Sequence, residues 1–206
     1  MRVRPRCPSR AVTALLLVTC ACGGEADPVG LGPGTGSETD PGSVACEPSP
    51  DPSGPFPTLP RRADPRAVTS GDVPHVQLNP GSTAELIAEL FDQIFSLPIL
   101  ENRPTIIGMA GTRAIWLTES VEITRPECVV AGREFAHIHL DGSLHGVLPH
   151  ERIPDAVAAG WVELHPFAGS TPGFEAFVML FAPRSSDEVV VIFDLVVESL
   201  NFVTGG

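Results

Sequence analysis

Residues 133–145 read REFAHIHLDGSLH, the stretch that most clearly indicates how this chain folds. The stretch from Glu134 to Leu140 is of strand length, and apolar and polar residues alternate from Ala136 to Leu140, a pattern typical of a strand with two different faces. The Asp141-Gly142 pair that follows is typical of a hairpin turn, so we expect a return strand over residues 144–148. The stretch therefore predicts a β-hairpin, and with it an antiparallel sheet.

The predicted hairpin carries three histidines. His137 and His139 must share one face, because successive side chains of a strand point to opposite sides. A two-residue turn would place His145 on the other face. A three-residue loop with Gly142 in the left-handed conformation would instead pair His145 with His137. The sequence leaves both registers open.

Hydrophobic periodicity and capping residues predict the remaining elements. In order, these are a helix that begins at the Ser82–Glu85 capping box and ends before Pro98, a strand at 114–117, the hairpin, a short helix from Pro154 to a cap at Gly160, a strand at 176–181 and a helix at 189–197. The last segment is rich in β-branched residues, but a second capping box at 185–188 and helical apolar spacing favour a helix. We therefore expect a single α+β domain over residues 75–206, with a mainly antiparallel sheet and about three helices.

Residues 1–74 are predicted to lie outside this domain. Basic residues, an apolar run too short to span a bilayer and the string Ala21-Cys22-Gly23 indicate a lipoprotein signal peptide (residues 1–21) with lipid attached to Cys22. Cys20 is the competing acceptor, and a plain signal peptide is the alternative. Residues 22–74, rich in Pro and Gly, are typical of a disordered tether. We therefore expect a membrane-anchored protein of the cell envelope, at the outer membrane if the cell has two membranes.

Two cysteines and the charge balance bear on partners. Cys46 in the predicted tether and Cys128 in the domain can pair outside the cytoplasm. Equally, Cys128 can be a small buried residue and Cys46 a free thiol. The formal net charge of −12 offers no basic surface for nucleic acid.

Three interpretations of the histidines compete. His137, His139 and His145 can bind Zn, Fe or Cu, which suit neutral imidazole. They can act as general bases or contact a polar substrate, because imidazole titrates near neutral pH. They can also be structural. No carboxylate stands at an obvious ligand spacing, which favours a base or substrate contact over a metal site.

A series of motifs extends from the hairpin to the last helix. It comprises Arg133-Glu134, Ala136-His137, His139, Leu144-His145, Gly160-Trp161, His165-Pro166, Ala168-Gly169 and Ala182-Pro183-Arg184, followed by acidic residues at 187 and 188. In this order the motifs resemble those of the fungal luciferase family and its bacterial relatives. The resemblance covers roughly residues 112–204.

The resemblance implies an oxygenase that needs no cofactor and acts on a small molecule. The fungal enzymes oxidise 3-hydroxyhispidin, an enolic pyrone, with O₂ as co-substrate, and an unstable peroxide then loses CO₂. By this resemblance, His137 or His139 is the base, while His145 and His165 are polar contacts. The alternatives are a lipid-anchored domain that binds a small molecule or protein without turnover, and a metal-binding lipoprotein.

The same resemblance implies residues that hold the substrate. Arg133, with Glu134 beside it, and Arg184 would stabilise the developing anion. Trp161 would form a wall of the pocket and exclude water. The competing interpretation makes Trp161 a core residue behind a helix cap. It makes the arginines members of structural ion pairs.

Overall fold

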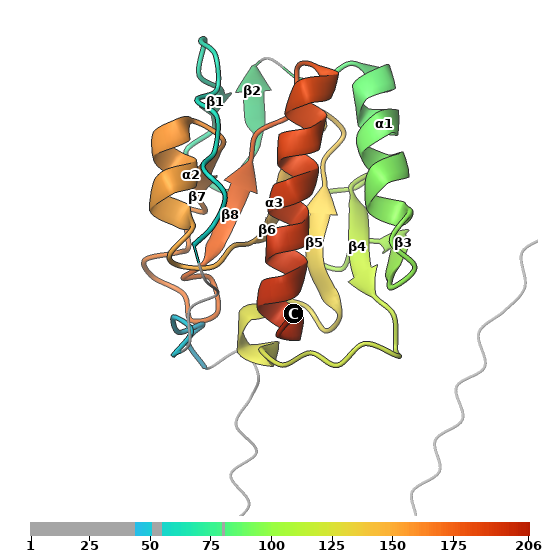
Figure 1. Cartoon of the computed structure of the whole chain (residues 1–206), viewed down its shortest axis with the longest axis vertical. Helices are drawn as coiled ribbons and strands as arrows, with labels where there is room; N and C mark the ends of the chain where they lie inside the picture. Colours follow the sequence, from blue (N-terminus) through green and yellow to red (C-terminus); the bar gives the residue numbers. More distant parts are fainter. Residues whose placement is uncertain (1–43, 51–54, 80) are drawn as a thin grey trace, which may run out of the picture. The chain divides into compact units, whose positions relative to one another are not determined.

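The computed structural model describes residues 44–50, 55–79 and 81–206, and a six-stranded sheet organises them. Its order is β3-β4-β5-β6-β8-β7, and every neighbouring pair is antiparallel. The strands are β3 (Leu100–Pro104), β4 (Arg113–Leu117), β5 (Glu134–Ile138), β6 (Leu144–Val147), β7 (Val162–Leu164) and β8 (Phe177–Leu180). The expected antiparallel sheet is confirmed, with the hairpin β5–β6 at its centre (Figure 1).

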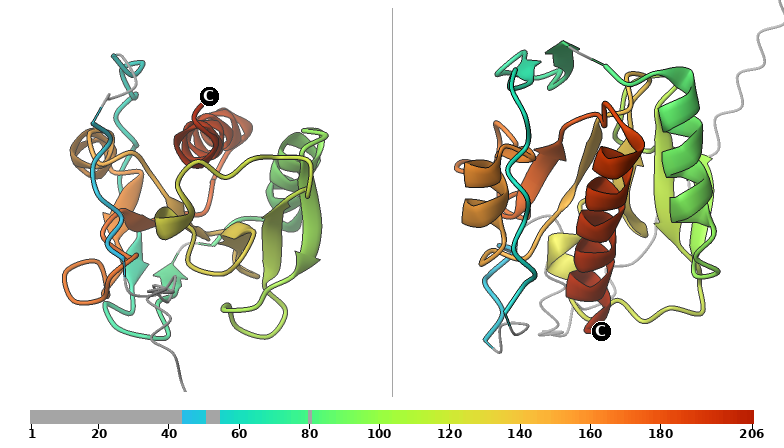
Figure 2. Two further views of the ribbon diagram at one scale, coloured as in Figure 1. Left: turned by 90° about the horizontal axis from the view of Figure 1, so that it is seen from below. Right: turned by 45° about the horizontal axis from the view of Figure 1, so that its top comes forward.

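Three helices lie on one face of this sheet (Figure 2, left). They are α1 (Ala84–Phe95), α2 (Ile153–Ala159) and α3 (Ser186–Thr204). The view in Figure 1 places α3 along the middle strands, between α1 and α2. The α+β prediction is therefore confirmed.

The approach of α3 to the sheet explains a glycine in β6. A Cβ atom on Gly146 would lie 3.2 Å from the Cβ of Ala136 and 3.9 Å from the Oγ of Ser199. Small residues at these positions let the helix pack closely on the hairpin. The buried Ile192, Leu195 and Val196 of α3 then complete the core on this face.

The N-terminal capping residue is the predicted one in α3 but lies one residue later than predicted in α1. Ser185 caps α3 as expected and accepts a hydrogen bond from the amide of Glu188, but α3 extends beyond residues 189–197 at both ends. The cap of α1 is Thr83 and not Ser82. The Ser82 hydroxyl donates instead to the carbonyl of Pro183, so a tertiary contact replaces the local one.

Two sheet strands were missed because they lack a strand signature. β3 has the sequence LENRP and β7 only three residues, and both lie at the edges of the sheet. Edge strands tolerate proline and charge because one side makes no ladder bonds. A second, two-stranded sheet of β1 (Val68–Thr69) and β2 (Gln77–Asn79) lies on the side opposite the helices (Figure 2, left).

The described part of the predicted tether is packed on the domain, which corrects the expectation for residues 44–50 and 55–74. Cys46 forms a disulfide with Cys128, and both are buried. The Trp161 indole donates to the carbonyl of Pro60, and the buried Arg62 pairs with Glu188. Composition missed this packing because the segment is held by a disulfide and polar anchors rather than by its own apolar residues.

The predictions for the N-terminus concern residues that the structure does not describe. The described residues do not include the expected signal peptide (residues 1–21) or the expected lipid attachment site, Cys22. Residues 23–43 and 51–54 of the predicted tether also lie outside them. Among the residues that the structure describes, no helix has the length and apolar character needed to cross a membrane.

Candidate functional site

The hairpin adopts the register that brings its histidines together. His137 pairs with His145, and Ala136 with Gly146. Gly142 has φ +87°, the left-handed conformation required by the three-residue loop. Because Ala136 and Gly146 face α3, the histidines occupy the opposite face of the sheet.

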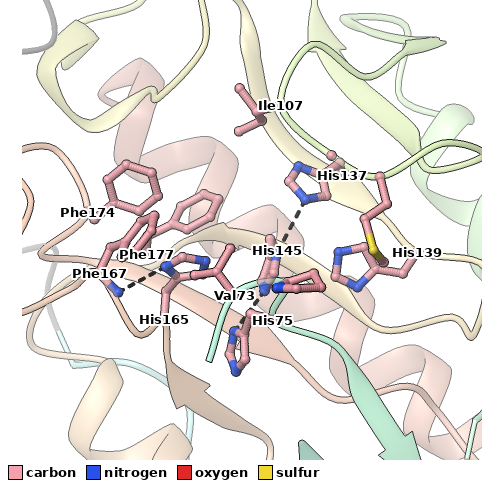
Figure 3. Close-up of a pocket in the computed structure, with 13 residues that line it drawn as sticks. Val73, His75, Ile107, His137, His139, His145, His165, Phe167, Phe174 and Phe177 are labelled. Atoms are coloured by element: carbon pink, nitrogen blue, oxygen red, sulfur yellow. Dashed lines mark hydrogen bonds between the residues drawn. The ribbon is translucent and has the colours of Figure 1, made fainter. Parts of the chain in front are cut away.

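Five histidines converge on this face (Figure 3). His137 lies on β5 and His139 just after it, while His145 lies on β6. His165 follows β7, and His75 precedes β2 in the segment that crosses this face. Each of the five is at most 7% exposed. The structure therefore brings together all four predicted catalytic histidines and adds a fifth.

The histidines line a cavity of about 160 Å³. Three aromatic rings form one wall: Phe167, Phe174 and Phe177 (Figure 3). The cavity also borders Val73, Ile107 and Met109, each between 43% and 48% exposed. The site is thus a polar cluster in a small aromatic pocket with an apolar rim.

The rings of three histidines form a chain between two carboxylates. His75 Nε2 lies 2.8 Å from Glu163 Oε1, and His75 Nδ1 lies 3.0 Å from His145 Nε2. His145 Nδ1 lies 3.3 Å from His137 Nε2. His137 Nδ1 is 3.1 Å from Glu134 Oε1, within ion-pair range but off the line of a hydrogen bond. Every ring nitrogen in the chain therefore faces another ionisable group.

The other two histidines have their tautomers set by neighbours. The Ser143 hydroxyl donates to Asp141 Oδ1 at 2.7 Å, so it accepts a hydrogen from His139 Nδ1 at 2.9 Å. The Nε2 atom of neutral His139 then carries a lone pair. His165 differs, because its Nδ1 accepts the amide hydrogen of Phe167 at 3.2 Å. Its Nε2 must therefore carry the hydrogen of the neutral ring.

Burial keeps most of these imidazoles neutral. It lowers the pKa of His139 to about 3 and that of His165 to about 4, and the neighbouring histidines add to both shifts. Burial also strongly lowers the pKa of His145. Burial alone would raise the pKa values of Glu134 and Glu163, but hydrogen bonds outweigh it and lower both. The site thus combines neutral rings at His139, His145 and His165 with ionised carboxylates at Glu134 and Glu163.

Glu134, expected to contact substrate, is a buried support of the cluster. Its carboxylate accepts from the Thr105 hydroxyl and from the amide of Ile106, each at 2.6 Å. It also faces His137 Nδ1. The residue lies behind the histidines and does not line the cavity.

The other expected substrate contacts lie in structural networks. Arg133 donates to the carbonyls of residues 117, 118 and 121. Arg184 donates to Glu188 and to the carbonyls of residues 63 and 65. Trp161 is 3% exposed and lies under the guanidinium of Arg62. None of the three lines the cavity, so the geometry favours the structural interpretation that the sequence had left open.

Sequence reasoning missed three residues of the site. His75 lies far upstream of the hairpin, where spacing carries no signal. Glu163 lies on a strand too short to be recognised. Ser143, which orients the His139 ring, is visible only as one residue of the hairpin loop. His75 and Glu163 join the site through tertiary contacts, whereas Ser143 joins it through the hairpin loop.

Comparison with known proteins supports the resemblance seen in the sequence. Residues 132–199 match the Luciferase domain family. Two curated relatives, both named "Luciferase", from Armillaria ostoyae and Armillaria mellea, are each 28% identical over 167 residues, covering 72% of this chain. Residues 132–199 are therefore luciferase-like. The luciferase-like segment 132–199 holds His137, His139, His145 and His165, whereas His75 lies before it.

The extent of these matches is partial. The aligned region covers 62% of each fungal luciferase, less than two thirds of its length. No solved structure matches the chain.

Proposed function

We propose that this protein is a luciferase-like oxygenase, which uses O₂ to oxidise a small enolic or phenolic molecule. One observation carries the proposal: a cluster of buried imidazoles lies at an aromatic pocket, and four of its five histidines belong to the luciferase-like segment. A buried polar cluster in a pocket is the usual place for chemistry.

The pocket favours a flat substrate with a polar head. A cavity of about 160 Å³ accommodates part of a drug-sized molecule, because typical ligand sites measure about 300–1,000 Å³. Phe167, Phe174 and Phe177 offer ring faces for stacking. The exposed Ile107 and Met109 would contact the apolar remainder outside. A hydroxypyrone or phenol that carries an apolar arm meets these requirements.

The imidazoles supply the acid–base part of such a reaction. A ring nitrogen with a lone pair, such as His139 Nε2, accepts the hydrogen of the substrate hydroxyl. The resulting enolate is rich in electrons, and its carbon forms a bond to O₂. Oxygen is the oxidant and is reduced to a peroxide, while the substrate carbon is oxidised. The surrounding phenylalanines exclude the water that would intercept this intermediate.

The test measures O₂ uptake and photon emission by the full chain with a 3-hydroxypyrone of the hispidin type. We expect His139→Gln to lower turnover by about 10²-fold or more, because a positioned base contributes about 10²–10⁴-fold. His150→Gln is the matched control, since His150 packs on Phe202 and does not line the cavity. Folded wild-type protein that consumes no O₂ with any substrate of this class would refute the proposal.

A further inference from the structure

We infer that His137, His139 and His145 bind one divalent transition-metal ion at the base of the pocket. One ring nitrogen from each of the three lies within 4.8 Å of the others, and all three rings are buried. The inference concerns the same site as the proposed oxygenase but does not depend on its turnover. With an ion bound, the Nε2 lone pair of His139 is a ligand and no longer the base of the proposed reaction, so the inference departs from the cofactor-free reaction that the resemblance implied.

A count of hydrogens in the histidine chain favours a cation between two of its rings. Glu163, His75, His145, His137 and Glu134 are separated by four gaps between facing polar atoms. If each of the three rings carries one N–H hydrogen, three hydrogens are available to fill them. With both carboxylates ionised, one gap must hold two facing lone pairs. A cation in that gap removes the repulsion.

The contacts at the two ends of the chain indicate which gap lacks a hydrogen. If His75 donates to Glu163, then His145 Nε2 donates to His75 Nδ1, and His145 Nδ1 keeps its lone pair. If His137 donates from Nδ1 toward Glu134, its Nε2 also keeps a lone pair. These two lone pairs face each other at 3.3 Å. Two nitrogens bound to one ion at about 2.0–2.1 Å and near-tetrahedral angles lie about 3.3 Å apart.

His139 supplies the third ligand in the same way. Its Nδ1 hydrogen is held by Ser143, which donates in turn to Asp141. The Nε2 lone pair of His139 is therefore available on the side of the other two. The second nitrogens of His139 and His145 thus donate a hydrogen to partners that lead to a carboxylate, and the second nitrogen of His137 faces the Glu134 carboxylate. Such outer partners are typical of metal-binding histidines.

A second triplet of histidines is less suited to an ion. His75, His145 and His165 also bring one nitrogen each within 4.8 Å. However, the Phe167 amide occupies Nδ1 of His165, which leaves the hydrogen of that ring on Nε2. A nitrogen that carries hydrogen cannot bind a metal. His165 is therefore a hydrogen-bond donor beside the proposed ion and not a ligand.

The ligand set selects the kind of ion. Three imidazoles without an oxygen ligand suit Zn²⁺, Cu²⁺, Ni²⁺ or Fe²⁺, whereas Mg²⁺ and Ca²⁺ require oxygen. Three protein ligands leave at least one position open, as in catalytic sites. The carboxylates of Glu134, Asp141 and Glu163 lie behind the ligands and balance the charge of the ion.

The experiment titrates Co²⁺ into the full chain after removal of metal with a chelator. We expect one Co²⁺ per chain, visible absorption of a nitrogen-ligated ion, and no thiolate-to-cobalt charge-transfer band. The absence of that band would exclude Co²⁺ binding at the cysteines of residues 1–43. His139→Gln should weaken Co²⁺ binding more than about 100-fold, and Glu163→Gln about 10–100-fold, as loss of an outer partner typically does. His165→Gln should change it less than about threefold.

Two results would overturn the inference. The first is that wild-type protein with native circular dichroism and cooperative unfolding binds neither Co²⁺ nor Zn²⁺. In that case a fourth hydrogen, carried by a protonated histidine of the chain, would supply the positive charge. The second is loss of binding in His165→Gln but not in His139→Gln, which would place the ion at the other triplet. Metal binding is measured without substrate, so bound metal without O₂ uptake would contradict only the proposed oxygenase.

Discussion

Gly142 determines whether the hairpin histidines meet. Its φ of +87° closes the three-residue loop that pairs His137 with His145. A Cβ atom at this position would lie 2.7 Å from the Cβ of Ser82 and 3.0 Å from Cγ1 of Ile87. Both the backbone conformation and the space around it therefore require glycine.

Gly142→Ala should lower the free energy of unfolding by more than about 2 kcal/mol, from backbone strain together with the clash on Ser82. Gly132→Ala is the matched control. Gly132 has φ +61° but no atom within 4 Å of an added Cβ, so only the strain of about 1–2 kcal/mol applies. Urea denaturation measures both. Equal losses in the two variants would show that the contact with Ser82 contributes nothing.

At the scale of elements, the start of α3 holds the N-terminal segment in place. Glu188, in the first turn of α3, accepts hydrogen bonds from the side chains of Arg62 and Arg184. Arg62 also donates to the carbonyl of Ala182 at 2.5 Å. One carboxylate thus joins a helix, the end of β8 and the segment that crosses α2, and this explains why Arg62 is buried.

This arrangement predicts acid sensitivity. Burial alone would raise the pKa of Glu188, but the hydrogen bonds from Arg184 and Arg62 outweigh it and lower the pKa to about 2. A depressed carboxyl pKa contributes stability above its unfolded value of about 4.3, and that stability is lost as the pH falls toward 2. The urea concentration at the unfolding midpoint should therefore decrease as the pH is lowered from 5 to 2.

Glu188→Gln tests the assignment. The variant should be less stable than wild type at pH 7, because Arg62 loses its charged partner, but its urea midpoint should depend less on pH between 5 and 2. An unchanged pH dependence in this variant would assign the acid sensitivity to other carboxylates.

At the scale of the whole molecule, a disulfide joins chain segments that are 82 residues apart. Cys46 and Cys128 have a Cα–Cα distance of 4.7 Å, and each is 1% exposed. The backbone of Cys46 also donates to the carboxylate of Glu175 at 2.9 Å. The bond therefore fastens the start of the described chain to the segment that precedes β5.

Removal of this bond should destabilise the protein by about 2–5 kcal/mol, because the reduced unfolded chain regains the freedom of a long loop. The measurement compares urea midpoints of wild type and Cys128→Ser with and without a reducing agent. Wild type should lose stability on reduction and Cys128→Ser should not respond. A wild-type urea midpoint that does not change on addition of the reducing agent would contradict the disulfide.

By itself, the sequence determined the features that depend on neighbours along the chain. Alternation predicted β5, the Asp141-Gly142 turn predicted β6 as its return strand, and capping boxes with apolar periodicity predicted α1 and α3. Pro154 and Gly160 predicted the bounds of α2. The motif order identified the luciferase-like resemblance. These signals are local because backbone hydrogen bonds and side-chain faces repeat every two to four residues.

Only the tertiary structure decided how the site is assembled. It decided the hairpin register, in which His137 pairs with His145, and it placed His75 between His145 and Glu163. It also moved Arg133 and Trp161 into structural contacts and joined Cys46 to Cys128. These outcomes depend on groups far apart in the chain, where the free energy of contact comes from burial and hydrogen bonding across the sheet and not from any pattern of neighbouring residues.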